Sequence, residues 1–353
     1  MDRDAVDNLC QPGESPQESG TGGADSSREP HGGTEDPLVL DFSTNTNPTT
    51  PDGIARAYDA ALSAAQSYPS DNYYEFRAAA AEYVGCEGPQ VIPVAGSLAA
   101  IRLTVATSVN PDEEVLVPYP SFGEYAREVR LQGGDPQLVA HDELLDTDPA
   151  GYALAIVCNP NNPTGDAYDA SRLRTYADRC RDAGTPLLVD EAFLDFTGEP
   201  TLAGRDGVIV TRSLTKLFGL PGLRAGFAVA TGTYRDRLDT ARLTWGVGKA
   251  ATCVGAHCLR QEEFVAETRQ RVESERERMR DRLEARFDVH PSDSPFLLLD
   301  VGSSDAVDEF RETVGEYDIV VRDARTFRGL DRHVRVALRL PYENDLLLDA
   351  LDV

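Results

Sequence analysis

Short apolar runs alternate with amphipathic stretches through the middle of the chain. The longer stretches have helical spacing, as in residues 167–183. Continuous apolar strands separated by helices are typical of a mostly parallel sheet that is covered on both faces. The pattern therefore predicts an α/β fold, with strands expected at Val91–Val94, Glu114–Val117, Ala153–Cys158, Pro186–Val189, Val208–Thr211 and Ala225–Ala230.

The pattern changes on either side of this region. A long charged helical stretch, 262–286, is predicted to be a connector. Beyond it the pattern indicates a strand, a helix, two strands and a helix, which predicts a small α/β domain. The first 30 residues are polar and acidic with few large apolar side chains, so we expect a disordered tail. The predicted division is a tail (1–30), an N-terminal arm that contributes to the small domain and the active site (31–65), a large domain (66–260), and the connector with the small C-terminal domain (261–353).

Composition excludes several classes of function. The 353 residues carry 60 acidic against 34 basic side chains, a formal net charge of −26, which argues against a nucleic-acid partner. The only lysines are Lys216 and Lys249, and this acidic, lysine-poor surface indicates a protein of a salty cytoplasm; an ordinary acidic protein is the alternative. The six cysteines lack metal-site spacing and read as buried, reduced thiols. No signal peptide or membrane span is evident, so we expect a soluble cytoplasmic protein.

Polar clusters follow several of the expected strands. They are Gly96-Ser97-Leu98, Asn159 to Gly165 (NPNNPTG), Asp190, Ser213-Leu214-Thr215-Lys216, and Gly222-Leu223-Arg224. Each cluster alone has an ordinary explanation as a cap, a turn or an ion pair. Ligands of open α/β sheets bind outside the carboxyl ends of the strands, and a helix that opens at Ser97 would offer free N–H groups to a phosphate. Together the clusters predict one binding site.

These motifs resemble those of fold-type-I pyridoxal phosphate (PLP) enzymes of the class I/II aminotransferase superfamily, from about residue 31 to the C-terminus. The resemblance implies that the Lys216 amine joins PLP covalently and moves protons, and that Asp190 pairs with the pyridine nitrogen. It also implies a homodimer with shared active sites, because Tyr68 matches a tyrosine that reaches the partner's phosphate group. The other implied cofactor contacts are Asn162 to the ring 3-oxygen, Phe122 stacked on the ring, and Ser97, Leu98, Ser213, Thr215 and Arg224 around the phosphate.

One position departs from the aminotransferase pattern. Phe193 stands where many aminotransferases have a tyrosine whose hydroxyl touches the ring 3-oxygen, and phenylalanine has no donor. Within the superfamily the chain resembles threonine-phosphate decarboxylases of cobalamin biosynthesis, near relatives of histidinol-phosphate aminotransferases. The resemblance is carried by four segments: HGG (31–33) ahead of DFSTNTNP (41–48), DEAFLDF (190–196), RSLTK (212–216), and the stretch from Val321-Arg322 through FRGLD (327–331) to VRVA (334–337).

This resemblance implies a small phosphorylated amino-acid substrate and adds substrate-binding residues. Arg335 would bind the substrate carboxylate, and Arg322 and His31 would lie near its phosphate. The other implied substrate-binding residues are Asn45, in the arm that covers the site, and Asn162. Ion pairing with surplus acid is the alternative for both arginines, and it is the interpretation given to Arg325 and Arg339. Decarboxylation of O-phospho-L-threonine is the expected reaction; transamination of histidinol phosphate and non-catalytic PLP binding in a regulator are the alternatives.

The acidic composition generates a prediction about salt. Unscreened repulsion among carboxylates should lower the melting temperature and the activity of the protein at low ionic strength. We expect the melting temperature to rise between about 0.1 M and about 3 M salt, a range that goes beyond ordinary Debye screening. A melting temperature that stays flat or falls over this range would remove the inference of a salty cytoplasm and leave the enzyme prediction intact.

Overall fold

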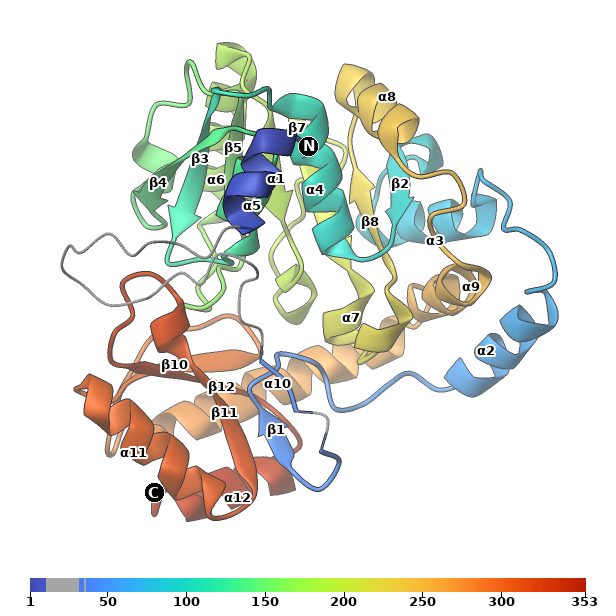
Figure 1. Ribbon diagram of the computed structural model, residues 1–353. Coiled ribbons are helices and arrows are strands. Elements are labelled where there is room, and N and C mark those ends of the chain that lie inside the picture. The colour runs from blue at the N-terminus through green and yellow to red at the C-terminus, as the bar shows by residue number, and fades with distance from the viewer. Residues whose placement is uncertain (11–31, 35) are drawn as a thin grey trace.

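A computed structural model describes residues 1–10, 32–34 and 36–353, and arranges them around two sheets (Figure 1). The larger sheet has the strand order β2-β8-β7-β6-β5-β3-β4 and the smaller has the order β1-β11-β12-β10-β9. The larger sheet comprises β2 (Val91–Val94), β3 (Glu114–Tyr119), β4 (Asp135–Ala140), β5 (Leu154–Cys158), β6 (Leu187–Asp190), β7 (Val208–Ser213) and β8 (Gly226–Val229). The smaller comprises β1 (Leu40–Phe42), β9 (Asp288–Val289), β10 (Phe296–Asp300), β11 (Ile319–Asp323) and β12 (His333–Ala337).

The helices cover the larger sheet on both faces, pack on the smaller sheet, and join the two (Figure 1). The α-helices are α1 (Arg3–Cys10), α2 (Ile54–Ser63), α3 (Tyr74–Val84), α4 (Ser97–Ser108), α5 (Glu124–Leu131), α6 (Ala170–Ala183), α7 (Leu214–Leu217), α8 (Gly232–Ala241), α9 (Lys249–Cys258), α10 (Glu262–Leu283), α11 (Ser304–Gly315) and α12 (Pro341–Ala350). Short 3₁₀ turns are η1 (Gly88–Gln90), η2 (Leu144–Asp146), η3 (Leu194–Phe196), η4 (Pro221–Leu223) and η5 (Ala324–Thr326). No helix in the described ranges is long and apolar enough to cross a bilayer.

The larger sheet confirms the predicted α/β class. Every strand runs parallel to its neighbours except β8, which is antiparallel to β2 and β7. Side chains of one strand alternate between two cores: Ile156 packs in the core with α4, α5 and α8, and Val157 in the core with α3, α6 and α9. The sequence pattern missed β4, because this edge strand mixes polar and apolar residues and none of its side chains is fully buried.

The smaller sheet takes its outer strand from the N-terminal arm. β1 pairs in parallel with β11, with Phe42 opposite Val321, whereas the other strand pairs are antiparallel. The connector helix α10 buries one stripe of residues three or four positions apart, which explains how so charged a helix packs between the domains. The stripe consists of Val265, Thr268, Val272, Glu275, Met279 and Leu283.

The N-terminus differs from the prediction of disorder over residues 1–30. Arg3–Cys10 forms α1, which contacts α5, and the Asp2 backbone N–H donates to the Leu131 carbonyl at 3.1 Å. Asp2 also caps the helix, since its side chain accepts from the Ala5 N–H at 2.8 Å. Val6 and Leu9, half-buried, supply an apolar face that the overall composition of the segment conceals. The rest of the predicted tail, from residue 11, lies outside the described residues.

The close packing of α9 generates a stability prediction. A Cβ added at Gly255 would lie 2.6 Å from Phe76 Cε2 and 3.1 Å from Leu214 Cδ2, so Gly255→Ala should force α9 away from α3 and α7. We expect a loss of about 1–3 kcal/mol in the free energy of unfolding, measured with urea. Gly315→Ala is the control, because nothing lies within 4 Å of its added Cβ, and it should gain up to about 1 kcal/mol from helix propensity. Equal stability of the two variants would contradict the packing argument.

Candidate active site

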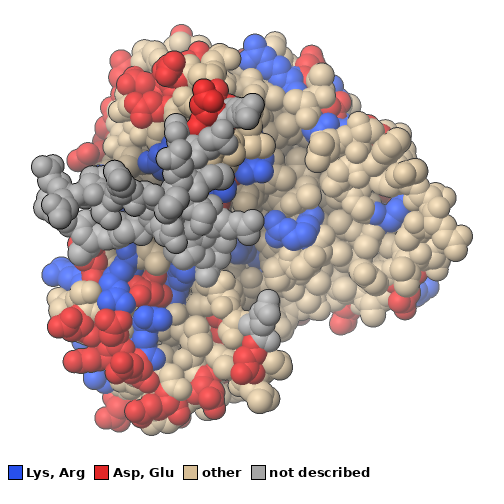
Figure 2. All heavy atoms as spheres, in the orientation of Figure 1, with Lys and Arg blue, Asp and Glu red and all other residues tan. Residues whose placement is uncertain are grey.

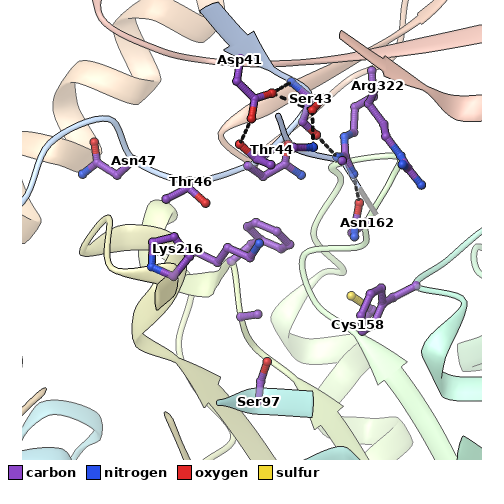
Figure 3. Close-up of a pocket in the computed structure, with 18 of the residues that line it drawn as sticks. Asp41, Ser43, Thr44, Thr46, Asn47, Ser97, Cys158, Asn162, Lys216 and Arg322 are labelled. Carbon is purple, nitrogen blue, oxygen red and sulfur yellow. Dashed lines mark hydrogen bonds between the residues drawn. The ribbon is translucent and has the colours of Figure 1, made fainter. Parts of the chain in front are cut away.

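A cavity of about 580 Å³ lies between the large domain, the small domain and the arm. Cys158 of β5 and Asp190 of β6 sit opposite each other at the carboxyl ends of neighbouring strands, and β7 ends at Ser213 just before α7. Parallel strands bring their carboxyl ends to one edge of a sheet, so residues far apart in sequence meet here. Figure 3 shows Ser97 and Cys158 on the large-domain side, Lys216 near the centre, and Asp41, Ser43 and Arg322 on the opposite side.

The structure brings most of the predicted site residues together. Those that line the cavity are Asn45, Ser97, Phe122, Asn162, Asp190, Phe193, Lys216, Arg322 and Arg335. Leu98, Ser213 and Thr215 lie beside these residues in the chain, at the starts of α4 and α7. Tyr68 lies elsewhere: it is 76% exposed and stacks on Trp245, with ring centroids 4.6 Å apart. His31 falls outside the described residues, although Gly32 and Gly33 line the cavity.

Asp190 is a buried carboxylate held by two donors. The Tyr125 hydroxyl donates to its Oδ2 at 2.7 Å and the Ala192 N–H donates to its Oδ1 at 3.1 Å. Burial raises the pKa of Asp190 to about 6, although both hydrogen bonds act to lower it. The sequence reasoning missed Tyr125. Its position three residues after Phe122, on a stretch with helical spacing, was the available signal.

Lys216 places its amine in the same cavity. The residue lies on the single turn of α7, and its Nζ is 5.6 Å from the centroid of the Phe193 ring. Burial, then repulsion from Arg335, lowers the pKa of Lys216 to about 8. Its amine can therefore lose a proton near neutral pH far more readily than an exposed lysine.

The start of α4 forms a cradle suited to an anion. The first backbone N–H groups of a helix have no partner within it, and they carry partial positive charge. Arg224 lies against this end: a Cβ at Gly96 would be 2.7 Å from Arg224 Nη2, and Gly96 has φ +90°. Glycine is therefore required there on two grounds. On the neighbouring turn, the Ser213 and Thr215 hydroxyls lie 2.6 Å apart, where both can face one ligand oxygen.

The small domain contributes two buried arginines. Arg335 of β12 donates to Asn162 Oδ1 and, at 3.0 Å, to the Ser43 carbonyl, which joins small domain, large domain and arm. Both acceptors are neutral, and the nearby Asp41 carboxylate acts on Arg335 through its charge rather than through a direct ion pair, so the guanidinium can still bind an anionic group. Arg322 lies directly opposite Arg335 in the sheet.

One aromatic ring holds both guanidiniums. Phe327, at the end of η5, lies 5.4 Å from the guanidinium of Arg322 and 5.7 Å from that of Arg335, measured to its ring centroid. The ring face favours cations, so it helps to keep two like charges close together. Repulsion from Arg322 is visible all the same, since it adds to burial in lowering the pKa of Arg335 to about 9. Phe327 belongs to the FRGLD segment, but its role was not foreseen.

Two other arginines form the ion pairs expected of them. Arg339 lines the cavity but pairs with Glu343 at 3.1 Å, and Arg325 pairs with Asp308 and Asp323. Figure 2 shows basic side chains gathered in the hollow between the domains, whereas acidic ones dominate the outer face of the small domain. The cleft is therefore a local basic site on a strongly acidic protein, which favours entry of small anions.

Comparison with known proteins agrees with this geometry. Residues 37–351 match the family model described as aminotransferase class I and II. The chain is 30% identical to a threonine-phosphate decarboxylase from Salmonella typhimurium, with 89% of this chain and 90% of that protein covered. It is 26% identical to histidinol-phosphate aminotransferase 1 from Archaeoglobus fulgidus, with 89% and 98% covered.

Solved structures share the fold. The crystal structure of histidinol-phosphate aminotransferase from Sinorhizobium meliloti in complex with pyridoxal-5′-phosphate is similar with a TM-score of 0.79 at 20% identity, covering 89% of each chain. At that identity the likeness supports the fold alone. The family model spans nearly the whole described chain, from the arm to α12. The chain therefore belongs to the class I and II aminotransferase family, whose cofactor is pyridoxal phosphate.

Proposed function

We propose that the protein decarboxylates O-phospho-L-threonine to (R)-1-aminopropan-2-yl phosphate in cobalamin biosynthesis. The observation that carries this proposal is the pair of buried arginines, Arg322 and Arg335, which share the ring of Phe327 in the cavity that holds Lys216. Two cations in a small pocket suit a substrate with two anionic ends, a carboxylate and a phosphate. The similarity to a threonine-phosphate decarboxylase supports the same substrate.

The residues of the pocket fit PLP. Asp190 is a buried carboxylate whose remaining lone pairs can accept a hydrogen bond from a protonated pyridine nitrogen, and Lys216 supplies an amine of lowered pKa. Phe122 lines the same cavity, where its ring can cover one face of the cofactor. Asn162 uses its Oδ1 for Arg335, which leaves its NH₂ group to donate to the ring 3-oxygen. The phosphate would be held by the start of α4, with Ser97 and Leu98, and by Ser213, Thr215 and Arg224.

Bound PLP supplies an electron sink for whichever bond at the substrate Cα lies perpendicular to its ring. The protein decides which bond that is by orienting the substrate. Arg335 would bind the carboxylate, with Arg322 near the phosphate and Asn45 of the arm close by. Lys216 Nζ would hold the proton that is returned to Cα after carbon dioxide leaves. Residues of the arm line one side of the cavity, where they would restrict the access of water.

Transamination of histidinol phosphate is the alternative function. The similarity to histidinol-phosphate aminotransferase 1 favours it, and Arg335 could bind the phosphate or the second carboxylate of a keto acid. Phe193 argues against it, because the phenyl ring packs on Phe296 with centroids 5.2 Å apart and offers no hydroxyl to the ring oxygen.

We also propose that the protein is a homodimer with shared sites. Large apolar side chains are exposed around α2, α9 and the segment before α9, a face that carries few charges in Figure 2. Such a patch is typical of an association surface. Tyr68, held on Trp245 at this face, would reach the partner's phosphate cradle. The exposed side chains on this face are Tyr58, Leu62, Tyr68, Tyr74, Leu243 and Trp245.

The salt-rich cytoplasmic setting stays a prediction from sequence.

The burial of Asp190 predicts that the free energy of unfolding depends on pH. Its folded pKa, about 6, lies above its ordinary value of 3.8, so the folded protein binds more protons than the unfolded chain between these pH values. Stability from this group is therefore present below about pH 4 and is lost as pH rises through about 6. Asp190→Asn should stabilise the apoprotein at pH 8 by about 1–3 kcal/mol in urea unfolding, and the gain should vanish near pH 4. A gain that does not depend on pH would contradict this.

The proposed reaction is tested directly with purified holoenzyme and O-phospho-L-threonine. We expect carbon dioxide release without any keto acid. Arg335→Ala should keep the visible absorption of bound PLP but lower kcat/KM by an amount equivalent to about 2–4 kcal/mol, because one buried charge-assisted contact to the substrate is lost. Arg325→Ala is the matched control, since it removes an arginine of the same domain that pairs with Asp308 outside the cavity. It should leave kcat/KM nearly unchanged.

The result that would overturn the proposal is equally direct. If wild-type protein releases no carbon dioxide from phosphothreonine but converts histidinol phosphate when 2-oxoglutarate is present, the transaminase function replaces the decarboxylase. A Lys216→Ala variant measures the background of both assays.

A further inference from the structure

Asn47, which lines the cavity, makes an unusual set of contacts. It lies on the arm, 6% exposed, and its backbone N–H donates to the Lys216 carbonyl at 2.9 Å. Its side-chain NH₂ donates to the Leu217 carbonyl at 2.7 Å and to Thr268 Oγ1 of α10 at 3.3 Å. One residue therefore holds two successive carbonyls of the turn that carries the PLP lysine.

The turn needs such a partner. α7 has only four residues, so the carbonyls at its end have no later helical N–H to accept from. The chain beyond α7 also fits closely around the arm. A Cβ at Gly219 (φ +65°) would lie 2.7 Å from the Asn47 carbonyl oxygen and 2.5 Å from that of Thr49. The arm is thus packed on both sides of the end of α7, and Figure 3 shows it passing over Lys216 from Thr44 to Asn47.

The other end of the Asn47 amide reaches the small domain. Its Oδ1 accepts from Arg271 Nη2 at 2.7 Å, and the Nη1 of the same arginine donates to the Arg339 carbonyl at 2.8 Å. Arg339 follows β12 by two residues, and β12 carries Arg335. A continuous path of hydrogen bonds therefore runs from the strand of the substrate-binding arginine to the backbone of the lysine.

We propose that Asn47 is a positioning residue that fixes the Lys216 turn relative to β12, so that the lysine amine and the Arg335 guanidinium keep one geometry across the cleft. Protein groups engage both ends of its side-chain amide, so Asn47 acts through the backbone of α7. The inference takes Lys216 as the PLP lysine, but it does not depend on which substrate is used. Small displacements of a reacting group have large kinetic effects, since a 1 Å misplacement can lower a rate by about 100-fold.

The test compares holoenzyme variants. Asn47→Leu removes every hydrogen bond of the amide at similar volume, including those that its Oδ1 accepts from Thr49 within the arm. Asn47→Asp keeps the acceptor for Arg271 and Thr49 but loses the donor to Leu217. Thr185→Val is the matched control, because the Thr185 hydroxyl is also buried and donates to the Pro149 carbonyl at 2.7 Å. Thr185 precedes β6, at the amino ends of the strands and away from the cavity. Asn47→Leu and Thr185→Val should lower the melting temperature to a similar extent.

Their function should differ. Asn47→Leu should lower kcat by about 10- to 100-fold with little change in KM. It should also move the pH at which the visible band of bound PLP titrates, because the lysine nitrogen shifts relative to Asp190 and Arg335. Thr185→Val should do neither. Arg271→Met should lower kcat as well. The rise in activation free energy of the double variant Asn47→Leu/Arg271→Met should be smaller than the sum of the rises in the two single variants, as expected when both break one path.

The outcomes separate this inference from the proposed function. If Asn47→Leu loses stability like Thr185→Val but keeps its kcat and spectral titration, the positioning role is wrong, whatever the substrate. If Asn47→Leu does not fold, the milder Asn47→Asp and Arg271→Met decide by the same measurements. The spectral titration needs no substrate, so it remains decisive even if phosphothreonine proves not to be the substrate.

Discussion

The burial of two ionisable groups in one cleft is the constraint on which this active site depends. Asp190 and Lys216 come from adjacent strands and the turn that follows, and desolvation disfavours the charged form of both. Much of the surrounding structure offsets this cost: Tyr125 and the Ala192 N–H donate to the carboxylate, and the sheet holds Asp190 in register between Cys158 and Thr211. A cofactor with a basic ring nitrogen and an aldehyde would offer a partner to both groups at once, so their burial favours its binding.

The two domains supply different groups to the site. The large domain supplies fixed chemistry from strand ends and helix starts, whereas the small domain supplies cations from a sheet whose outer strand is borrowed from the arm. Phe327 allows Arg322 and Arg335 to be neighbours in spite of their charge, and β11 and β12 set their spacing. Substrate selection can thus change in the small domain without disturbing the groups that bind the cofactor.

The sequence allowed us to predict the location of the site residues that follow directly after strands. Lys216, Asp190 and Asn162 each follow an apolar run, and parallel strands must deliver such residues to one edge. The pairings of Tyr125 with Asp190 and of Asn47 with Arg271 could not be predicted, because they join residues of different elements that no local spacing relates. The Arg339–Glu343 pair is the opposite case, because its four-residue spacing can be seen in the sequence. The pair distinguishes Arg339 from Arg322 and Arg335, the arginines proposed to bind substrate. The domain boundaries and the individual roles of site residues stay predictions.

The pairing of β1 with β11 also orders events during synthesis. Leu40 leaves the ribosome long before its partner Ile319. The strands of the larger sheet lie between them in the chain, and an N-terminal domain generally folds as a unit while translation continues. We therefore expect the larger sheet, which forms one side of the cavity, to fold first. The arm strand β1 can pair only after β11 has been made. A site that is complete only after β11 and β12 have been made keeps a nascent chain from acting before that point.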